Sequence, residues 1–115
     1  MIYKLLRAEE WARLQAARSF AGSAVDLADG FVHFSTAAQV RETAAKHFAG
    51  VRGLVLAEVD PERLRGPLKW EPSRGGALFP HLYAELPLAA VTRRWTLAPG
   101  PDGRHEFPSE IPSDQ

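Results

Sequence analysis

Leu54-Val55-Leu56-Ala57-Glu58-Val59 decides the fold, because it is the clearest buried strand in this sequence of 115 residues. Its short apolar run is rich in branched side chains, as buried strands are. Gly53 precedes the run and Asp60-Pro61 ends it, since proline lacks the backbone donor that a strand interior requires. We therefore expect one buried strand at 54–59 with shorter elements arranged around it.

Upstream of this strand the sequence alternates between apolar stripes and glycine-containing connections. Thr36 is suited to cap a helix in which Val40 and Ala44 share one stripe, and Gly50 follows its end. The expected upstream elements are strands at 2–6 and 31–35, helices at 8–17 and 37–48, and a loop at 19–30. Downstream we expect a helical turn at 62–64 and strands at 68–71, 81–86 and 91–97.

Two main helices and about six short strands, without regular alternation, predict an α+β domain and not a doubly wound parallel sheet. This single compact domain is expected to span residues 1–98. Residues 99–115 are rich in proline, glycine and polar side chains, which predicts an extended or loosely ordered C-terminal tail.

The composition limits the classes of partner. Fourteen basic and fourteen acidic side chains cancel, so we expect no general attraction to nucleic acid or to an anionic membrane. The absence of cysteine excludes disulfides and thiolate catalysis. No signal peptide or membrane-spanning stretch is recognisable in the sequence. These features predict a cytoplasmic protein, either a monomer or a weak homodimer, whose partner is a small molecule.

Trp70-Glu71-Pro72-Ser73-Arg74-Gly75-Gly76 is suited to a binding site, because rigid, flexible and charged residues are combined in it. Arg74 offers a planar fork of donors that fits a phosphate or a carboxylate. Gly75 and Gly76 let backbone N–H groups approach such an anion, and Ser73 adds a hydroxyl beside them. The alternative is an ordinary loop with a solvated arginine.

Alternation along two strands predicts two polar rows. His33 and Ser35 share one side of the strand at 31–35, whereas His81 and Tyr83 share one side of the strand at 81–86. If both rows line one cleft, His33, His81 and Tyr83 are the candidate catalytic residues, and Ser35 joins Ser73 to Gly76 in holding the ligand. If the rows face opposite sides, no such site exists.

The other polar residues have simpler explanations. Asp26 and Asp29 flank a glycine-bearing turn, where aspartate commonly accepts from backbone donors. Glu71 can pair with Arg74, and His47 is placed to interact with the end of its helix. A metal centre built from the histidines has no supporting spacing, so we predict no metal site.

Several segments in a distinctive order resemble a known family. They are Asp29-Gly30-Phe31-Val32-His33-Phe34-Ser35-Thr36, His47-Phe48-Ala49-Gly50, the strand at 54–59, the segment 70–76, and Phe79-Pro80-His81-Leu82-Tyr83. Over residues 3–96 the chain resembles the bacterial domain-of-unknown-function family numbered 952. The family is thought to be distantly similar to ADP-ribosyltransferase-like folds. This resemblance implies a bent or split mixed β-sheet whose cleft holds NAD in active relatives.

The resemblance implies roles for few residues. His33-Phe34-Ser35-Thr36 is similar to the stretch that contacts the ribose of NAD in that superfamily. Arg74 is the single counterpart of its phosphate-binding residues, and Glu85 is the one candidate for its late glutamate. We therefore predict binding of a phosphate-bearing or nucleotide-like ligand, with ADP-ribosyl transfer or NAD hydrolysis as the enzymatic version. The alternative is a ligand sensor or a protein-interaction module that presents Trp70, Leu78 and Phe79.

Overall fold

The computed structural model describes residues 1–112, except for the side chain of Arg74. The described strands are β1 (Ile2–Leu6), β2 (Ser19–Phe20), β3 (Val32–His33), β4 (Leu54–Val59), β5 (Leu68–Pro72), β6 (Leu78–Leu82), β7 (Leu86–Pro87) and β8 (Val91–Leu97). The described helices are α1 (Ala8–Ala17), α2 (Ala24–Asp29) and α3 (Ala37–His47), with 3-10 turns at Pro61–Arg63, Arg74–Gly76 and Leu88–Ala90.

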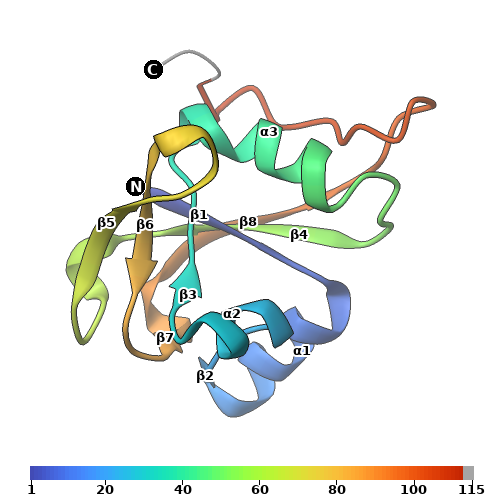
Figure 1. Cartoon of the computed structure of the whole chain (residues 1–115). Helices are drawn as coiled ribbons and strands as arrows, with labels where there is room; N and C mark the ends of the chain where they lie inside the picture. Colours follow the sequence, from blue (N-terminus) through green and yellow to red (C-terminus); the bar gives the residue numbers. More distant parts are fainter. Residues whose placement is uncertain (113–115) are drawn as a thin grey trace.

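The strands form small antiparallel sheets in the orders β1-β4-β8, β2-β7 and β3-β6-β5. Every strand pairing in residues 1–112 is antiparallel. The α+β class is therefore correct, but the expectation of a mixed sheet is wrong. Figure 1 shows α3 on one side of the β1-β4-β8 sheet and α1 with α2 on the other.

The expectation of two main helices also needs correction, because α2 lies within the segment predicted to be a loop. Ser23 caps α2 by accepting from the backbone N–H of Asp26, and the Asp26 carboxylate accepts from the backbone N–H of Ser23 in return. This reciprocal capping box satisfies donors at the helix start. Gly30 ends the helix with a positive φ of 89°, so a stretch rich in turn residues folds into a short helix.

Strand β4 is buried along its whole length, as predicted. Its alternating side chains contribute to two apolar clusters, one on each face of the β1-β4-β8 sheet. Glu58 interrupts the apolar run, and its carboxylate accepts hydrogen bonds from Tyr3, Thr92 and Arg93. These bonds compensate the burial of a charged group inside the sheet. They also lower the pKa of Glu58, with the bond from Arg93 as the main cause.

The strand expected at 81–86 is shifted. Strand β6 begins at Leu78 and ends at Leu82, and a bend at residues 83–84 separates it from β7. At this bend the backbone N–H of Tyr83 donates to the carbonyl of Pro67. Ala84 packs against Gly66, where an added Cβ would lie 2.6 Å from the Cβ of Ala84. The glycine permits this close approach, and the chain turns here before the predicted alternation is complete.

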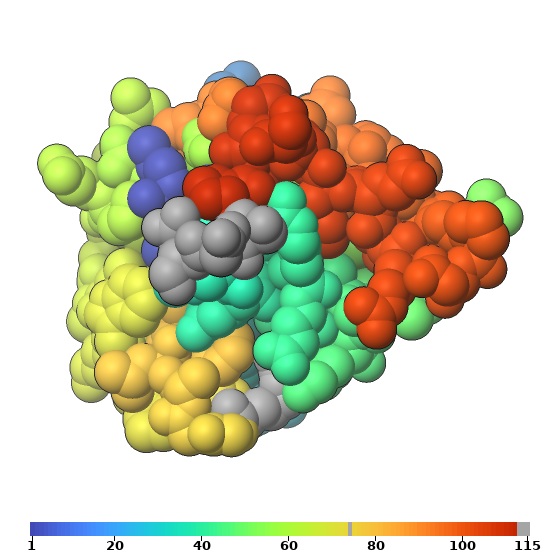
Figure 2. Space-filling model, turned by 90° about the horizontal axis from the view of Figure 1, so that it is seen from above, coloured from blue at the N-terminus to red at the C-terminus, as the bar shows by residue number. Residues whose placement is uncertain are grey.

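The segment after β8 turns back on itself at residues 101–103, with an antiparallel bridge between Pro99 and His105, and then runs beside α3, as Figure 2 shows from above. Ile111 is 1% exposed and packs in the cluster beneath α3. The guanidinium of Arg41 on α3 donates to the carbonyl oxygens of Ile111 and Pro112. Residues 113–115 of the expected tail lie outside the described residues. Among the described residues, no helix combines the length and apolar character needed to cross a membrane.

Candidate functional site

The two candidate catalytic histidines are direct partners across a pair of strands. His33 on β3 lies opposite His81 on β6 in the antiparallel register. Side chains directly opposite one another project to the same face of a sheet. The two imidazole rings meet edge to face with their centroids 5.3 Å apart. The structure thus brings the two predicted polar rows together at these residues, and their chemical role stays a prediction.

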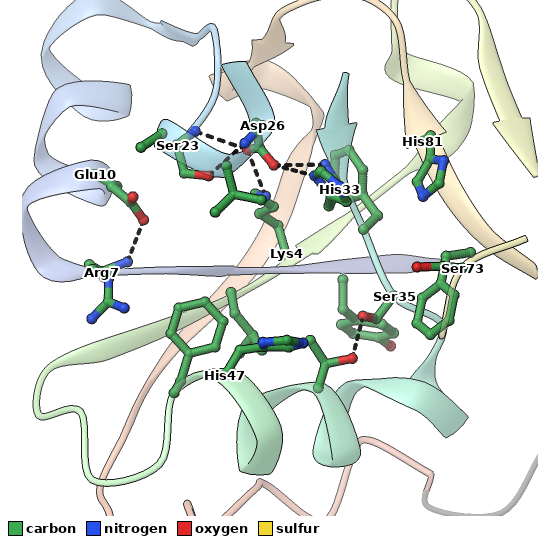
Figure 3. A pocket seen from close by; sticks show the side chains of 18 residues that line it. Lys4, Arg7, Glu10, Ser23, Asp26, His33, Ser35, His47, Ser73 and His81 are labelled. Atoms are coloured by element: carbon green, nitrogen blue, oxygen red, sulfur yellow. Dashed lines mark hydrogen bonds and ion pairs between the residues drawn. The ribbon is translucent and has the colours of Figure 1, made fainter. Parts of the chain in front are cut away.

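Both rings face a cavity of about 540 Å³, here called the histidine cavity. It lies between α2 and α3 beside strand β1, and Figure 3 shows the side chains around it. Its lining residues are Tyr3, Lys4, Leu5, Arg7, Glu10, Ser23, Ala24, Val25, Asp26, His33, Phe34, Ser35, Thr43, His47, Phe48, Ser73, Phe79 and His81. A cavity of this volume is typical of small-molecule sites.

Asp26 is the centre of a buried polar network on one wall. Its Oδ2 accepts from the Nζ of Lys4 at 2.9 Å and from the backbone N–H of Ser23 at 2.9 Å. Its Oδ1 lies 2.6 Å from the Nδ1 of His33 and accepts from the backbone N–H of His33 at 3.1 Å. Both carboxylate oxygens are therefore used, and the imidazole of His33 is fixed in orientation (Figure 3).

Burial by itself would raise the pKa of Asp26, since it disfavours the charged form. The hydrogen bond from His33 and the charge and hydrogen bond of Lys4 outweigh that effect. The pKa of Asp26 is consequently well below its usual range. Asp26 therefore provides a fixed negative charge inside the protein, balanced directly by Lys4.

The second ring nitrogen of His33 faces another carboxylate. Its Nε2 lies 2.9 Å from the Oδ2 of Asp29, one helical turn after Asp26 on α2. The Asp29 side chain is half exposed, whereas Asp26 is almost fully buried. His33 is thus held between one buried and one accessible carboxylate.

His81 is oriented by a different carboxylate, on the neighbouring strand β5. Its Nδ1 lies 2.8 Å from the Oε1 of Glu71, and the hydroxyl of Tyr83 donates to the same oxygen at 2.8 Å. Phe31 stacks on the imidazole with centroids 4.0 Å apart. His81 is 3% exposed, and its Nε2 has no hydrogen-bond partner among the described residues. A buried polar atom without a partner at a cavity wall is a feature of ligand sites.

The pKa of Glu71 provides a test of this geometry, because the hydrogen bond from His81, followed by that from Tyr83, lowers it. We expect His81→Phe to move the pKa of Glu71 upward toward its ordinary value, and Tyr83→Phe to do so to a smaller extent. Titration of the side-chain carboxyl carbon by NMR measures both shifts. An unchanged pKa of Glu71 in His81→Phe would contradict the contact.

Of the other residues predicted to hold the ligand, some line the histidine cavity and some do not. Ser35 and Ser73 line the histidine cavity, and the Oγ of Ser35 lies 3.2 Å from the Oγ1 of Thr43. Gly75 and Gly76 have positive φ angles of 66° and 81°, which glycine readily adopts. Neither residue lines the cavity. Arg74 lies in the same turn, and its side chain is outside the described residues, so its predicted contact with an anion stays a prediction.

Tyr83, the third candidate catalytic residue, does not line the histidine cavity. Its hydroxyl donates to Glu71, and the ammonium of Lys69 lies over its ring at 4.9 Å from the centroid. The bond to Glu71 raises the pKa of Tyr83. Tyr83 therefore contacts Glu71, the partner of His81, and not the cavity itself. Its predicted part in proton transfer stays a prediction.

Sequence reasoning missed the residues that fix His33. Lys4 was read only as part of an apolar strand, and Asp26 only as a turn residue. The spacing of Ser23 and Asp26, which fits a capping box, was the available signal, and the structure explains the preceding Gly22, where an added Cβ would lie 2.5 Å from the Cβ of Asp26. A glycine next to Ser23-Ala24-Val25-Asp26 permits the aspartate to pack inward against the backbone. His47, set aside as a helix-end residue, also lines the cavity.

The cavity has charged residues near one end and no gathered metal ligands. Arg7 and Glu10 line it near the start of α1, where the carboxylate of Glu10 accepts from the backbone N–H of Arg7. The guanidinium of Arg7 lies over the ring of Phe48. Within residues 1–112, no three His, Cys, Asp or Glu side chains gather in a way that could hold a metal ion.

The solved structures that resemble this chain include those of CC0527 from Caulobacter crescentus. Its crystal structure is 52% identical to this chain, with a TM-score of 0.87 over 91% of this chain and 92% of that one. The solution NMR structure of CC0527 is 53% identical, with a TM-score of 0.79 over 90% and 89% of the two chains. No curated protein matches this sequence.

The family comparison matches most of the domain. Residues 5–94 match the family described as "Protein of unknown function (DUF952)". The match includes β3, β6 and the loop with Ser73, which together supply His33, His81 and one wall of the histidine cavity. The chain therefore belongs to the DUF952 family of proteins of unknown function.

Proposed function

We propose that this protein binds a phosphate-bearing or nucleotide-like small molecule in the histidine cavity. The observation that carries the proposal is the Nε2 of His81, which is buried at the cavity wall without a hydrogen-bond partner among the described residues. Leaving a buried polar atom unpaired costs about 1–3 kcal/mol. A ligand hydrogen-bonded to His81 would remove that cost.

The charge of the lining supports an anionic ligand. Lys4 is 6% exposed and lines the cavity, and its ammonium donates to the Asp26 carboxylate. An ammonium group has three donors, so Lys4 retains donors beyond the one used by Asp26. Arg7 supplies a second cation near the start of α1. Phosphate oxygens are suitable acceptors for both groups.

The more specific proposal is that the ligand is NAD or a related dinucleotide. His33 and Ser35, the residues implied by the resemblance to ADP-ribosyltransferases, both line the cavity. Glu85, the candidate late glutamate, does not line it, and the carboxylate that contacts His81 from β5 is Glu71. In this version the protein cleaves the nicotinamide–ribose bond and transfers ADP-ribose to an acceptor or to water.

Thermal unfolding with NAD, ADP-ribose, ribose 5-phosphate and inorganic phosphate tests the proposal. A ligand at about 100 times its Kd stabilises the folded state by about 2.7 kcal/mol, which raises Tm by about 10 °C for a domain of this size. We expect Arg7→Met to reduce the shift, whereas Arg52→Met, which removes an exposed arginine outside the cavity, should leave it unchanged. Absence of a Tm shift with every probe at millimolar concentration would overturn the proposal.

The alternative function is a sensor that binds the same ligand without converting it. Phe79, which a protein-interaction surface was expected to present, is 9% exposed and lines the cavity, although Trp70 and Leu78 remain exposed. This arrangement favours a ligand site over a surface built on all three residues. An assay of nicotinamide release from NAD separates enzyme from sensor, because a sensor shows a Tm shift without release.

A further inference from the structure

We infer that the two adjacent histidines hold different numbers of protons, so that His81 is the general base of the histidine cavity and Glu71 is its positioning residue. His33, by contrast, is a fixed cation. The inference extends the proposed function and depends on it in one respect, because the hydroxyl on which His81 would act belongs to the ligand of that cavity.

The contacts of His33 require a proton on both ring nitrogens. Nδ1 lies 2.6 Å from Asp26 and Nε2 lies 2.9 Å from Asp29. Ionised carboxylates only accept hydrogen bonds, and imidazole donates from both nitrogens only as the cation. Asp26 is held ionised by its hydrogen bonds from Lys4, Ser23 and the backbone N–H of His33. His33 is therefore the imidazolium partner of a fixed buried anion.

The contacts of His81 require a proton on Nδ1, and no contact requires one on Nε2. The carboxylate of Glu71 accepts a hydrogen bond from the hydroxyl of Tyr83. An ionised carboxylate can only accept, so its short contact with the Nδ1 of His81 requires an N–H at that nitrogen. A second imidazolium with its centroid 5.3 Å from His33 would be disfavoured by like-charge repulsion. In the neutral ring the lone pair then resides on Nε2, the buried atom without a partner.

The charged and titratable groups around both rings agree with this arrangement. Asp26 and Asp29 face His33 from α2, and Lys4 on β1 neutralises the inner carboxylate. Glu71 on β5 faces His81, and besides His33 the ring that packs on His81 is the apolar ring of Phe31. His33 thus has two anionic partners and His81 has one, which places the additional proton on His33.

This arrangement specifies the ligand and the first chemical step. The ligand presents a hydroxyl to the Nε2 of His81 and an anionic group toward Lys4, as a sugar phosphate does. His81 takes the hydroxyl proton: the O–H bond breaks, an N–H bond forms at Nε2, and the oxygen keeps the electron pair. The new charge on the ring is compensated by Glu71 at 2.8 Å, as in carboxylate–histidine pairs of general-base catalysts.

Nitrogen-15 NMR of the histidine side chains in the ligand-free protein at neutral pH tests the proton placement. We expect His81 to show a single neutral tautomer protonated at Nδ1, and His33 to be protonated at both nitrogens. His47→Gln and His105→Gln identify the signals of the remaining two histidines. A proton on the Nε2 of His81, or a neutral His33, would overturn the inference, and neither outcome requires a substitution at His33 or His81.

Two matched variants separate the positioning role of Glu71 from a purely structural one. Glu71→Gln keeps the size of the side chain but offers His81 either an amide oxygen or an NH2 group, so we expect the exclusive Nδ1–H tautomer to be lost. Tyr83→Phe removes the other partner of Glu71 and keeps the carboxylate, so the tautomer should persist. An unaltered tautomer in a folded Glu71→Gln protein would contradict the assignment of Glu71.

A ligand comparison tests the chemical class. We expect ribose 5-phosphate to raise the Tm of the natural sequence more than inorganic phosphate does, because only the sugar offers hydroxyls. His81→Phe should weaken ribose 5-phosphate about tenfold and leave phosphate unaffected; equal loss for both would overturn the assignment of the hydroxyl to His81. Failure of both probes to bind would overturn the proposed function. The NMR experiment on the ligand-free protein tests the proton placement independently of ligand binding.

Discussion

Asp26→Ala is expected to destabilise the fold by about 3–5 kcal/mol, the usual cost of removing one partner from a buried ion pair. The substitution leaves the ammonium of Lys4 buried without its carboxylate and releases Ser23 and His33. Urea unfolding of the variant and of the natural sequence, followed by circular dichroism, measures the difference in free energy. The loss is large because four donors converge on one side chain.

Asp29→Ala is the matched control, since Asp29 also contacts His33 but is half exposed. Surface ion pairs contribute about 0–1 kcal/mol, so we expect this variant to unfold close to the natural sequence. Similar stability losses in the two variants would show that burial of Asp26 is not the cause. A loss below about 1 kcal/mol for Asp26→Ala would contradict the role of the network.

The same network predicts how stability depends on pH. The pKa of Asp26 is lower in the folded state than in the unfolded chain, where it is ordinary. The unfolded state therefore binds the proton more readily as the medium becomes acidic, and stability is lost as pH falls below about 4. In Asp26→Asn this part of the acid loss should be absent, which unfolding curves at several pH values measure.

The second large effect is expected at Ile111, at the far end of the segment after β8. Ile111 is fully buried against α3, so Ile111→Ala should cost about 2–5 kcal/mol through lost apolar contacts and a cavity. A residue in a loosely ordered tail would cost almost nothing. Urea unfolding therefore decides whether residues 99–112 are part of the cooperative unit.

Ser109→Ala provides the comparison within the same segment, because Ser109 is exposed. We expect it to change the free energy of unfolding by less than about 0.5 kcal/mol. Equal behaviour of Ile111→Ala and Ser109→Ala would show that the segment does not contribute to folding stability. A loss confined to Ile111→Ala would place the limit of the folded unit beyond residue 98.

Elements with strong local patterns were predicted well from the sequence. The strand at Leu54–Val59 and the helix capped by Thr36 agree with β4 and α3, because apolar periodicity and capping act within a few residues. Helix α2 was missed because Asp and Gly are typical of turns, and here the same residues form a capping box and a helix end. The end of β6 was misplaced because the bend packs against a distant segment, where Pro67 accepts from Tyr83 and Gly66 leaves room for Ala84.

By itself the sequence determined the α+β class, the family, and two histidines on strands with alternating polar rows, since local patterning encodes these features. Only the tertiary structure decided that His33 and His81 are partners across strands and that Lys4, Asp26 and Glu71 orient them. These contacts join β1, α2, β3, β5 and β6, which are far apart in the chain. Register and burial, which set the distances and charges between such residues, arise only when the sheets pack together.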